Sequence, residues 1–217
     1  ETGETAGQIS FNFTIREGNS SYWKTETEAA GGINFIGGYL IGTGKKSDLI
    51  VKRETTDSKS FYHVRYGKDI FDIFSNEFFI QLQDNHSSRL KERRLIGGGI
   101  RKALISANKG TMNLGIGFMS ESELLTDDSQ ISGFRSTNYL SIKSKWSDRI
   151  HLTSVLYVQP NLKDLNDMRI LLDFKPSITI SDHFTFTQKT ILRYDAMPPE
   201  SVEKLDYEII QMIQYQF

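Results

Sequence analysis

The four histidines are the first residues to consider for chemistry. A hydrolase of the lipase type needs a serine and a histidine on one exposed face, with a carboxylate or amide that orients the histidine. By the two-residue period described below, His63, His151 and His183 fall on the polar face, whereas Ser154 falls on the apolar face. Since no serine–histidine pair results, we expect no catalytic residues and no enzyme activity.

Acidic residues supply a second possible chemistry. Asp84-Asn85-His86 and Asp127-Asp128 have the residue types of a protease at a barrel rim, but acids in loops are commonly only solvated. Glu121 and Glu123 lack the spacing of a calcium-binding EF-hand loop. The glycines at 97–99 precede no Lys-Ser/Thr and are therefore no phosphate cradle. We expect no metal and no cofactor.

The composition excludes several classes of protein. The 26 basic and 27 acidic side chains give a net charge of −1, so a strongly basic nucleic-acid binder is excluded. Zero cysteines exclude a disulfide scaffold, a thiolate zinc site and a cysteine nucleophile. No apolar run is long enough for a transmembrane helix, which leaves open a β-barrel that crosses the membrane with alternating strands.

The polarity of the sequence alternates with a period of two residues, and helical periodicity is nearly absent. Over residues 168–180 the even positions are apolar, whereas Arg169, Asp173 and Lys175 occupy odd positions. A strand separates two such sets onto opposite faces, while a helix would scatter them. Because Pro176 cannot donate a ladder hydrogen bond, we expect a bulge or local break there.

The same alternation predicts about twelve strands. The clearest segments are 112–118, 150–159, 168–180, 184–195 and 204–217, and less regular ones are 9–18, 22–35, 48–57, 60–73, 77–86, 91–105 and 132–146. Glycine pairs leave the segment 22–47 open to two interpretations, which are one long bulged strand or two shorter strands.

The connections between these strands alternate in length. Short turns are expected at 106–110, 146–149 and 181–183, and longer loops at 121–131, 159–167 and 195–203. Short turns at one end and long loops at the other are typical of an outer-membrane barrel. No linker divides the chain, so we predict one domain over 1–217, with 1–7 as a flexible periplasmic N-terminus.

Alternation alone does not decide which face points inward, because a soluble lipid-binding barrel buries the apolar set and a membrane barrel exposes it. Aromatic side chains gather in two bands that match the two interfaces of a bilayer. This predicted aromatic girdle comprises Trp146, Phe184, Phe186, Tyr194, Tyr207, Tyr215 and Phe217. We therefore predict an all-β fold: a closed antiparallel up-and-down transmembrane β-barrel of about 12 strands in the bacterial outer membrane, with both termini periplasmic.

Several motifs resemble those of one protein family. Gln159-Pro160-Asn161-Leu162-Lys163-Asp164 with Asp167-Met168-Arg169 is similar to its "P-S-L-x-D…D-Y-R" stretch, and 193–199 to its "R-Y-D-S-x-P-P" segment. The terminal Tyr215-Gln-Phe217 resembles the family's "Y-x-F" ending and the assembly signal of outer-membrane barrels. The family consists of small bacterial outer-membrane proteins of unknown function, named after a salt-induced protein of enterobacteria. The resemblance implies a barrel and no established activity.

The charged residues of the polar face are the best candidate site. The predicted lumen-lining residues are Lys24, Glu26, Glu28, Arg65, Arg101, Arg135, Lys143, Arg169, Asp173, Lys175, Lys189, Arg193, Asp195 and Glu208. Balanced charges that pair across the lumen would make a structural or docking barrel in an envelope or stress-related role. Unpaired charges would line a narrow, weakly selective pore for ions or small solutes. An outer-membrane hydrolase is a third alternative.

The expected partners follow from this location. They are outer-membrane lipids, the barrel-assembly machinery, which would bind the C-terminal strand, and other envelope proteins. We expect no nucleic acid as a partner.

Overall fold

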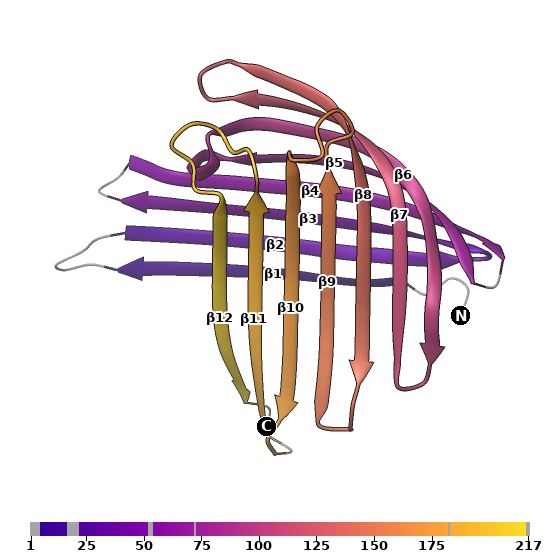
Figure 1. Cartoon of the computed structure of the whole chain (residues 1–217). Coiled ribbons are helices and arrows are strands. Elements are labelled where there is room, and N and C mark those ends of the chain that lie inside the picture. Colours follow the sequence, from indigo (N-terminus) through magenta and orange to yellow (C-terminus); the bar gives the residue numbers. More distant parts are fainter. Residues whose placement is uncertain (1–4, 17–21, 52–53, 72, 182, 216–217) are drawn as a thin grey trace. The chain divides into compact units, whose positions relative to one another are not determined.

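The chain forms an all-β, up-and-down sheet of twelve strands in the computed structural model (Figure 1). The structure describes residues 5–16, 22–51, 54–71, 73–181 and 183–215. The strands are β1 (Thr5–Arg16), β2 (Tyr22–Phe35), β3 (Gly38–Val51), β4 (Glu54–Phe71), β5 (Phe74–Asn85), β6 (Leu90–Ala107), β7 (Gly110–Leu125), β8 (Gln130–Lys145), β9 (Ile150–Pro160), β10 (Met168–Thr179), β11 (Phe184–Asp195) and β12 (Leu205–Tyr215).

Every strand is hydrogen-bonded to its neighbours in the sequence, in the order β1 to β12. The pairs from β1 to β4 and from β8 to β12 are antiparallel. A short 3-10 helix, η1 (His86–Ser88), follows β5. Within the described ranges, no helix has the length and apolar character needed to cross a bilayer.

The segment 22–47 contains a hairpin, which is the second of the two interpretations of the sequence. β2 and β3 pair from Tyr22 with Val51 to Phe35 with Gly38. The turn at Ile36 and Gly37 places Gly37 at a φ of +73°, a conformation that glycine adopts without a steric penalty. The strand predicted at 48–57 is therefore wrong, because 48–51 end β3 and 54–57 begin β4.

Two further predictions on boundaries are corrected. The loop predicted at 121–131 is mostly strand, because β7 continues to Leu125 and β8 begins at Gln130. Thr5, Ala6 and Gly7, expected in a flexible N-terminus, belong to β1. The rest of that predicted N-terminus lies outside the described residues.

Pro176 interrupts the ladder between β10 and β11 as the sequence predicts. Register partners run from Arg169 with Asp195 to Phe174 with Thr190 and resume at Ser177 with Thr187. The residue numbers of two paired residues add up to the same value before and after Pro176. No residue is therefore inserted in either strand, and no bulge forms. The interruption is a local break of the ladder.

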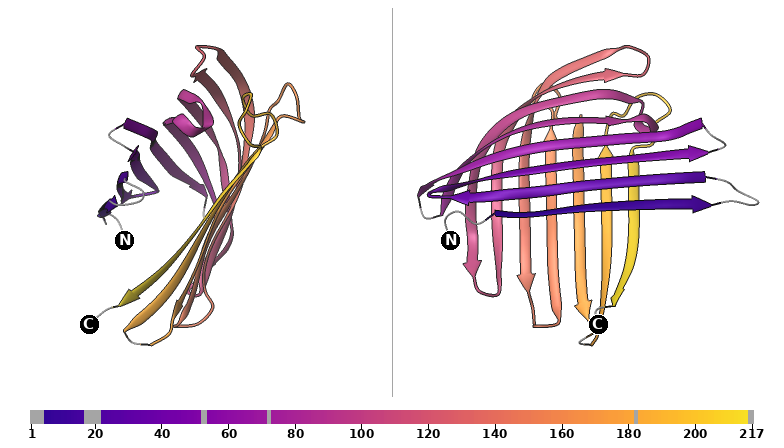
Figure 2. Two further views of the ribbon diagram at one scale, coloured as in Figure 1. Left: turned by 90° about the vertical axis from the view of Figure 1, so that its left-hand side faces the viewer. Right: turned by 180° about the vertical axis from the view of Figure 1, so that it is seen from behind.

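Contacts divide the chain into two compact units. Unit 1 comprises Glu1–Phe71, Ser75–Gly98 and Met119–Phe134, and unit 2 comprises Asp72–Phe74, Gly99–Phe118 and Arg135–Phe217. The views of Figure 2 show β1 to β4 side by side in unit 1 and β9 to β12 side by side in unit 2. The boundaries cut through β5, β6, β7 and β8, and one lies at the short connection between β4 and β5. The single domain over 1–217 stays a prediction.

The burial pattern is the reverse of that in a soluble protein. Along β7, Leu114, Ile116 and Phe118 are exposed, whereas Glu121 and Glu123, which lie beyond them on the other face, are buried. Apolar residues normally occupy the interior, and charged residues are almost never fully buried unless paired. The arrangement along β7 is the opposite of that expected for a soluble barrel with an apolar interior.

Candidate functional site

The predicted lumen residues of unit 2 share one face of the sheet, which we call the polar face. Directly opposed residues of an antiparallel pair lie on the same face. The register opposes Arg169 to Asp195, and Arg193, two residues before Asp195, lies on that face as well. Lys143, Asp173, Lys175 and Glu208 join this face through the registers of β8 to β12. His151 also lies on it and Ser154 does not, as the two-residue period predicts.

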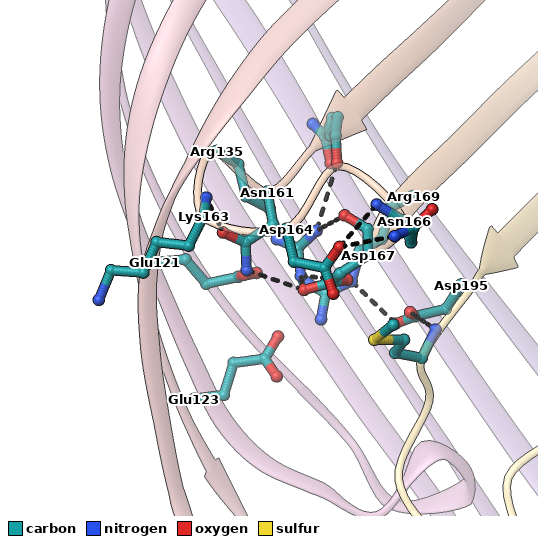
Figure 3. Close-up of polar contacts among 12 residues, drawn as sticks. Glu121, Glu123, Arg135, Asn161, Lys163, Asp164, Asn166, Asp167, Arg169 and Asp195 are labelled. Carbon is teal, nitrogen blue, oxygen red and sulfur yellow. Dashed lines mark hydrogen bonds and ion pairs between the residues drawn. The ribbon is translucent and has the colours of Figure 1, made fainter.

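Arg135 fastens the β9–β10 loop (161–167), as Figure 3 shows. Its guanidinium donates to both carboxylate oxygens of Asp167 at 2.9 and 2.8 Å, and to the carbonyl oxygens of Asp167 at 3.1 Å and Gln159 at 3.3 Å. The Asn161 amide donates to Asp167 Oδ2 at 2.9 Å. Arg135 is only 3% exposed, so this bidentate contact is a buried ion pair. It ties the loop to β8.

A second buried arginine secures the next loop. Arg169 Nε lies 2.8 Å from Asp195 Oδ2, and the backbone N–H of Met197 donates to Asp195 Oδ1 at 3.1 Å. The N–H of Ala196 donates to the carbonyl of Met168 at 3.0 Å, which joins the start of the 196–204 loop to the start of β10. The motif residues that carry the family resemblance therefore build the fastenings of these two loops. The loops at 161–167 and 196–204 lie at one end of the strands of unit 2, which we call its loop end. The turns at 146–149 and 180–183 lie at the other end of these strands, which we call its turn end.

Unit 1 has ion pairs of its own. Lys24 Nζ lies 2.8 Å from Glu26, and Lys45 Nζ lies 3.0 Å from Glu28. These side chains are partly exposed, so each pair contributes little to stability.

Arg65 belongs to a more buried group. Its Nη1 lies 3.5 Å from Glu77 Oε2, and the Tyr39 hydroxyl donates to Glu77 Oε1. The guanidinium also lies over the Phe79 ring, 5.8 Å from the centroid, at the distance of a cation–π contact. Glu77 is a functional candidate that the sequence reading missed.

His63 lies in a stack of rings and has no nucleophile beside it among the contacts described for unit 1. Its ring is nearly parallel to those of Phe61 and Phe79, with centroid distances of 6.1 and 5.7 Å. Its Nδ1 lies 3.2 Å from the Gln81 amide oxygen. These contacts make His63 a packing residue on the face of β4 that also carries Arg65.

The group of Arg93, Glu121 and Glu123 was also missed. Arg93 Nε lies 3.3 Å from Glu121 Oε1 and is hydrogen-bonded to Glu123 Oε1, and both glutamates are at most 4% exposed. The alternation would have indicated both glutamates if β7 had been continued beyond residue 118. Ser120 and Ser122 occupy the apolar face of β7 but are polar. The alternation between apolar and polar residues is therefore lost from the sequence beyond residue 118.

Only some of the predicted lumen residues form ion pairs in the described part of the chain. Lys24, Glu26, Glu28, Arg65, Arg135, Arg169 and Asp195 form ion pairs. For the described part of the chain, no ion pair involves Lys143, Asp173, Lys175, Lys189, Arg193 or Glu208. Arg101 is a partly buried residue of β6 that has interactions of its own.

The described residues of the predicted aromatic girdle lie toward both ends of the strands of unit 2, and the girdle itself stays a prediction. Trp146 and Phe184 are exposed at the turn end, and Phe186 follows them in β11. Tyr207 is exposed near the loop end, where Tyr194 ends the same face of β11. The register places the backbone of Tyr215 opposite Phe184, and Phe217 lies outside the described residues.

Asp127 and Asp148 of the connecting turns are exposed acids that accept local hydrogen bonds. Hydrogen bonds from the Ser129 hydroxyl and backbone N–H lower the pKa of Asp127, and the hydrogen bond and charge of Lys145 lower the pKa of Asp148. Within the described ranges, no three His, Cys, Asp or Glu side chains are placed to hold a metal ion.

The comparison with protein families identifies the chain. Residues 11–217 match the model of the family described as "Protein of unknown function, DUF481". The chain belongs to this family. DUF481 proteins carry no activity in that description, so the family supplies no substrate.

Two further comparisons add little to this. No curated protein matches the sequence. A solved structure described as "KdgM porin in complex with disordered oligogalacturonate" is similar to this DUF481 chain with 9% identity and a TM-score of 0.47 over 98% of this chain and 99% of that one.

Proposed function

We propose that this DUF481 protein is a closed β-barrel of the bacterial outer membrane, with the polar face lining the lumen and the apolar face in contact with lipid. The observation that carries this is the reversed burial: Ile9 and Ile213 are 82% and 73% exposed, whereas Glu121 and Arg135 are 4% and 3% exposed. Exposed apolar side chains are stable in hydrocarbon, and closure leaves no unsatisfied strand edge there. Loops outside and both termini in the periplasm complete the proposal.

Single cysteines test this orientation, since the chain has no cysteine of its own. Thr153 lies on the polar face and its neighbour Leu152 on the apolar face. In lipid nanodiscs, we expect a water-soluble maleimide to label T153C and a lipid-soluble maleimide to label L152C. A chain that is monodisperse without detergent, with L152C open to the water-soluble reagent, would contradict the proposal.

We further propose that the lumen is closed near the loop end and that the barrel has a structural or docking role in the envelope, without catalysis. The buried pairs of Arg135 with Asp167 and of Arg169 with Asp195 support this, since each satisfies a charge within the polar face. The loops that they fasten would be pre-organised for a protein partner of the envelope. The barrel-assembly machinery would bind the C-terminal strand.

The second candidate function is a narrow pore for ions or small solutes. It is favoured by the six ionic residues of the polar face for which the described residues provide no ion pair. Planar-bilayer recording separates the two functions. We expect silence over a wide range of salt and voltage for the structural barrel, and steady single-channel steps would establish the pore instead.

A further inference from the structure

Three lysines form one transverse row on the polar face of unit 2. Lys143 of β8 is the register partner of Thr153 in β9, and Thr153 is the partner of Lys175 in β10. The continuous register across the break at Pro176 places Lys189 of β11 opposite Lys175. At a strand spacing of about 4.8 Å, the row is about 14 Å long.

The row brings like charges together without acidic partners in it. Like charges directly opposite one another destabilise a sheet. Lys143 and Lys175 are exposed and Lys189 is partly exposed, and the described residues offer no ion pair to any of the three. The ladder between β10 and β11 is broken at the same place.

The neighbouring rows do not neutralise this charge. On the loop side, Asp173 and Glu208 lie one row away and form no ion pair with the lysines among the described contacts. In the row on the turn side, Lys145 Nζ lies 3.0 Å from Asp148 Oδ1, and the register partner of Lys145 is His151. This row therefore supplies no acidic side chain to the three lysines. The lysine row and the acidic row together carry three positive and two negative charges, a net +1.

We infer that the row of Lys143, Lys175 and Lys189 is a binding site for multivalent anions, which are molecules that carry two or more carboxylate or phosphate groups. Such a ligand offsets several ammonium charges at once and accepts hydrogen bonds from them and from the Thr153 hydroxyl. A monovalent anion would offset only one charge. The inference rests on the proposed function in one respect, namely that the polar face is accessible to water.

Calorimetric titration of the whole protein in nanodiscs at low salt tests the site, with tripolyphosphate and citrate as probes and chloride as the monovalent reference. We expect saturable binding of both probes and none of chloride. K143Q, K175Q and K189Q should each raise the dissociation constant about three- to tenfold, as expected for the loss of one solvent-accessible hydrogen bond. K175R retains the charge and should restore binding.

Lys163→Gln is the matched control, because Lys163 is an exposed residue of the β9–β10 loop. It should leave both dissociation constants unchanged. The inference is overturned if neither probe binds saturably, if the three row variants bind as the wild type does, or if the control variant loses as much. Binding of tripolyphosphate alone would restrict the site to phosphates and also overturn it as stated.

Labelling of T153C separates failure of the site from failure of the barrel orientation. A water-soluble thiol reagent that reaches this position without any binding of the probes refutes the anion site alone. If the reagent does not reach it, the wet polar face and therefore the proposed function fail as well. With both correct, an anionic reagent reacts faster than a cationic one, and K175Q reduces that ratio.

Discussion

Arg135 and Asp167 are the two side chains whose pairing should matter most for stability. Asp167→Asn leaves the guanidinium, at 3% exposure, with an incomplete set of partners. Removing one partner of a buried ion pair costs about 3–5 kcal/mol. We expect a loss of about 3 kcal/mol in the free energy of unfolding, measured by denaturant titration in micelles.

Asp164→Asn is the control for this change, because Asp164 is exposed in the same loop. It should shift the free energy of unfolding by no more than about 0.5 kcal/mol, as is usual for surface sites. Equal losses in the two variants would show that the Arg135 pair does not hold the loop.

Asp127 provides a prediction on pH. The Ser129 hydroxyl donates to its Oδ1 at 2.6 Å and the Ser129 N–H at 2.9 Å, and these bonds lower the pKa of Asp127 below its ordinary value of 3.8. A lowered pKa in the folded state contributes stability above the ordinary value, and this contribution is lost as the pH falls through the folded pKa. Ser129→Ala should raise the pKa of Asp127, as followed by NMR titration of the carboxyl carbon. An unchanged titration would refute the role of the hydroxyl.

At this scale, the sequence predicts which face a residue occupies but not which partner it meets. Period two places Arg135, Arg169 and Asp195 on one face, and the register does so too, because strand geometry fixes the face. The bond from Arg135 to Asp167 depends on the path of a loop, which alternation does not encode. Glu121 and Glu123 were missed because their neighbours on the apolar face of the strand are serines, which interrupt the alternation of apolar and polar residues.

At the scale of the strands, the close approach of β6 and β7 depends on Gly99. A Cβ on Gly99 would collide with the backbone carbonyl of Ile116 and lie 2.6 Å from Cα of Gly117. Gly99→Ala therefore forces two backbones apart, and overpacking of this kind costs about 1–3 kcal/mol. We expect a corresponding fall in the midpoint of thermal unfolding followed by circular dichroism.

Gly42 in β3 gives the opposite expectation for the same substitution. A Cβ there would have no neighbour within 4 Å. Gly42→Ala should leave stability unchanged or raise it by up to about 1 kcal/mol, because alanine reduces the freedom of the unfolded chain. A loss as large as that of Gly99→Ala would show that the glycines act through something other than close approach.

The number and type of the strands could be predicted, whereas one register region could not. Eleven of the twelve predicted segments overlap one strand each, since each segment separates two faces, whereas the segment 48–57 spans the end of β3 and the start of β4. The β2–β3 hairpin was left open because glycines at 31, 32, 37 and 38 have no side chain to mark a face. The turn at Ile36 and Gly37 is decided by pairing between strands, which is not a local property of the sequence.

For the molecule as a whole, closure requires β1 to pair with β12. Ile9, Phe11, Phe13 and Ile209 are exposed apolar residues of these two strands. We expect a cysteine at 209 to form a disulfide with a cysteine at one of positions 9, 11 and 13 under mild oxidation in nanodiscs, because a disulfide needs Cα atoms about 4.4–6.8 Å apart. A cysteine at Ile33 in β2, one strand further along, should not cross-link to it. Absence of every cross-link would refute the closed barrel.

The pairing of each strand only with its predecessor and successor has a consequence for how the protein assembles. Each hairpin joins segments that are close along the chain, so its formation requires little loop-closure entropy. Successive hairpins can add to a growing sheet one at a time, and only the seam between the first and last strands unites distant segments. Topologies that depend on distant segments form more slowly, so sealing that seam should be the final and slowest event of insertion.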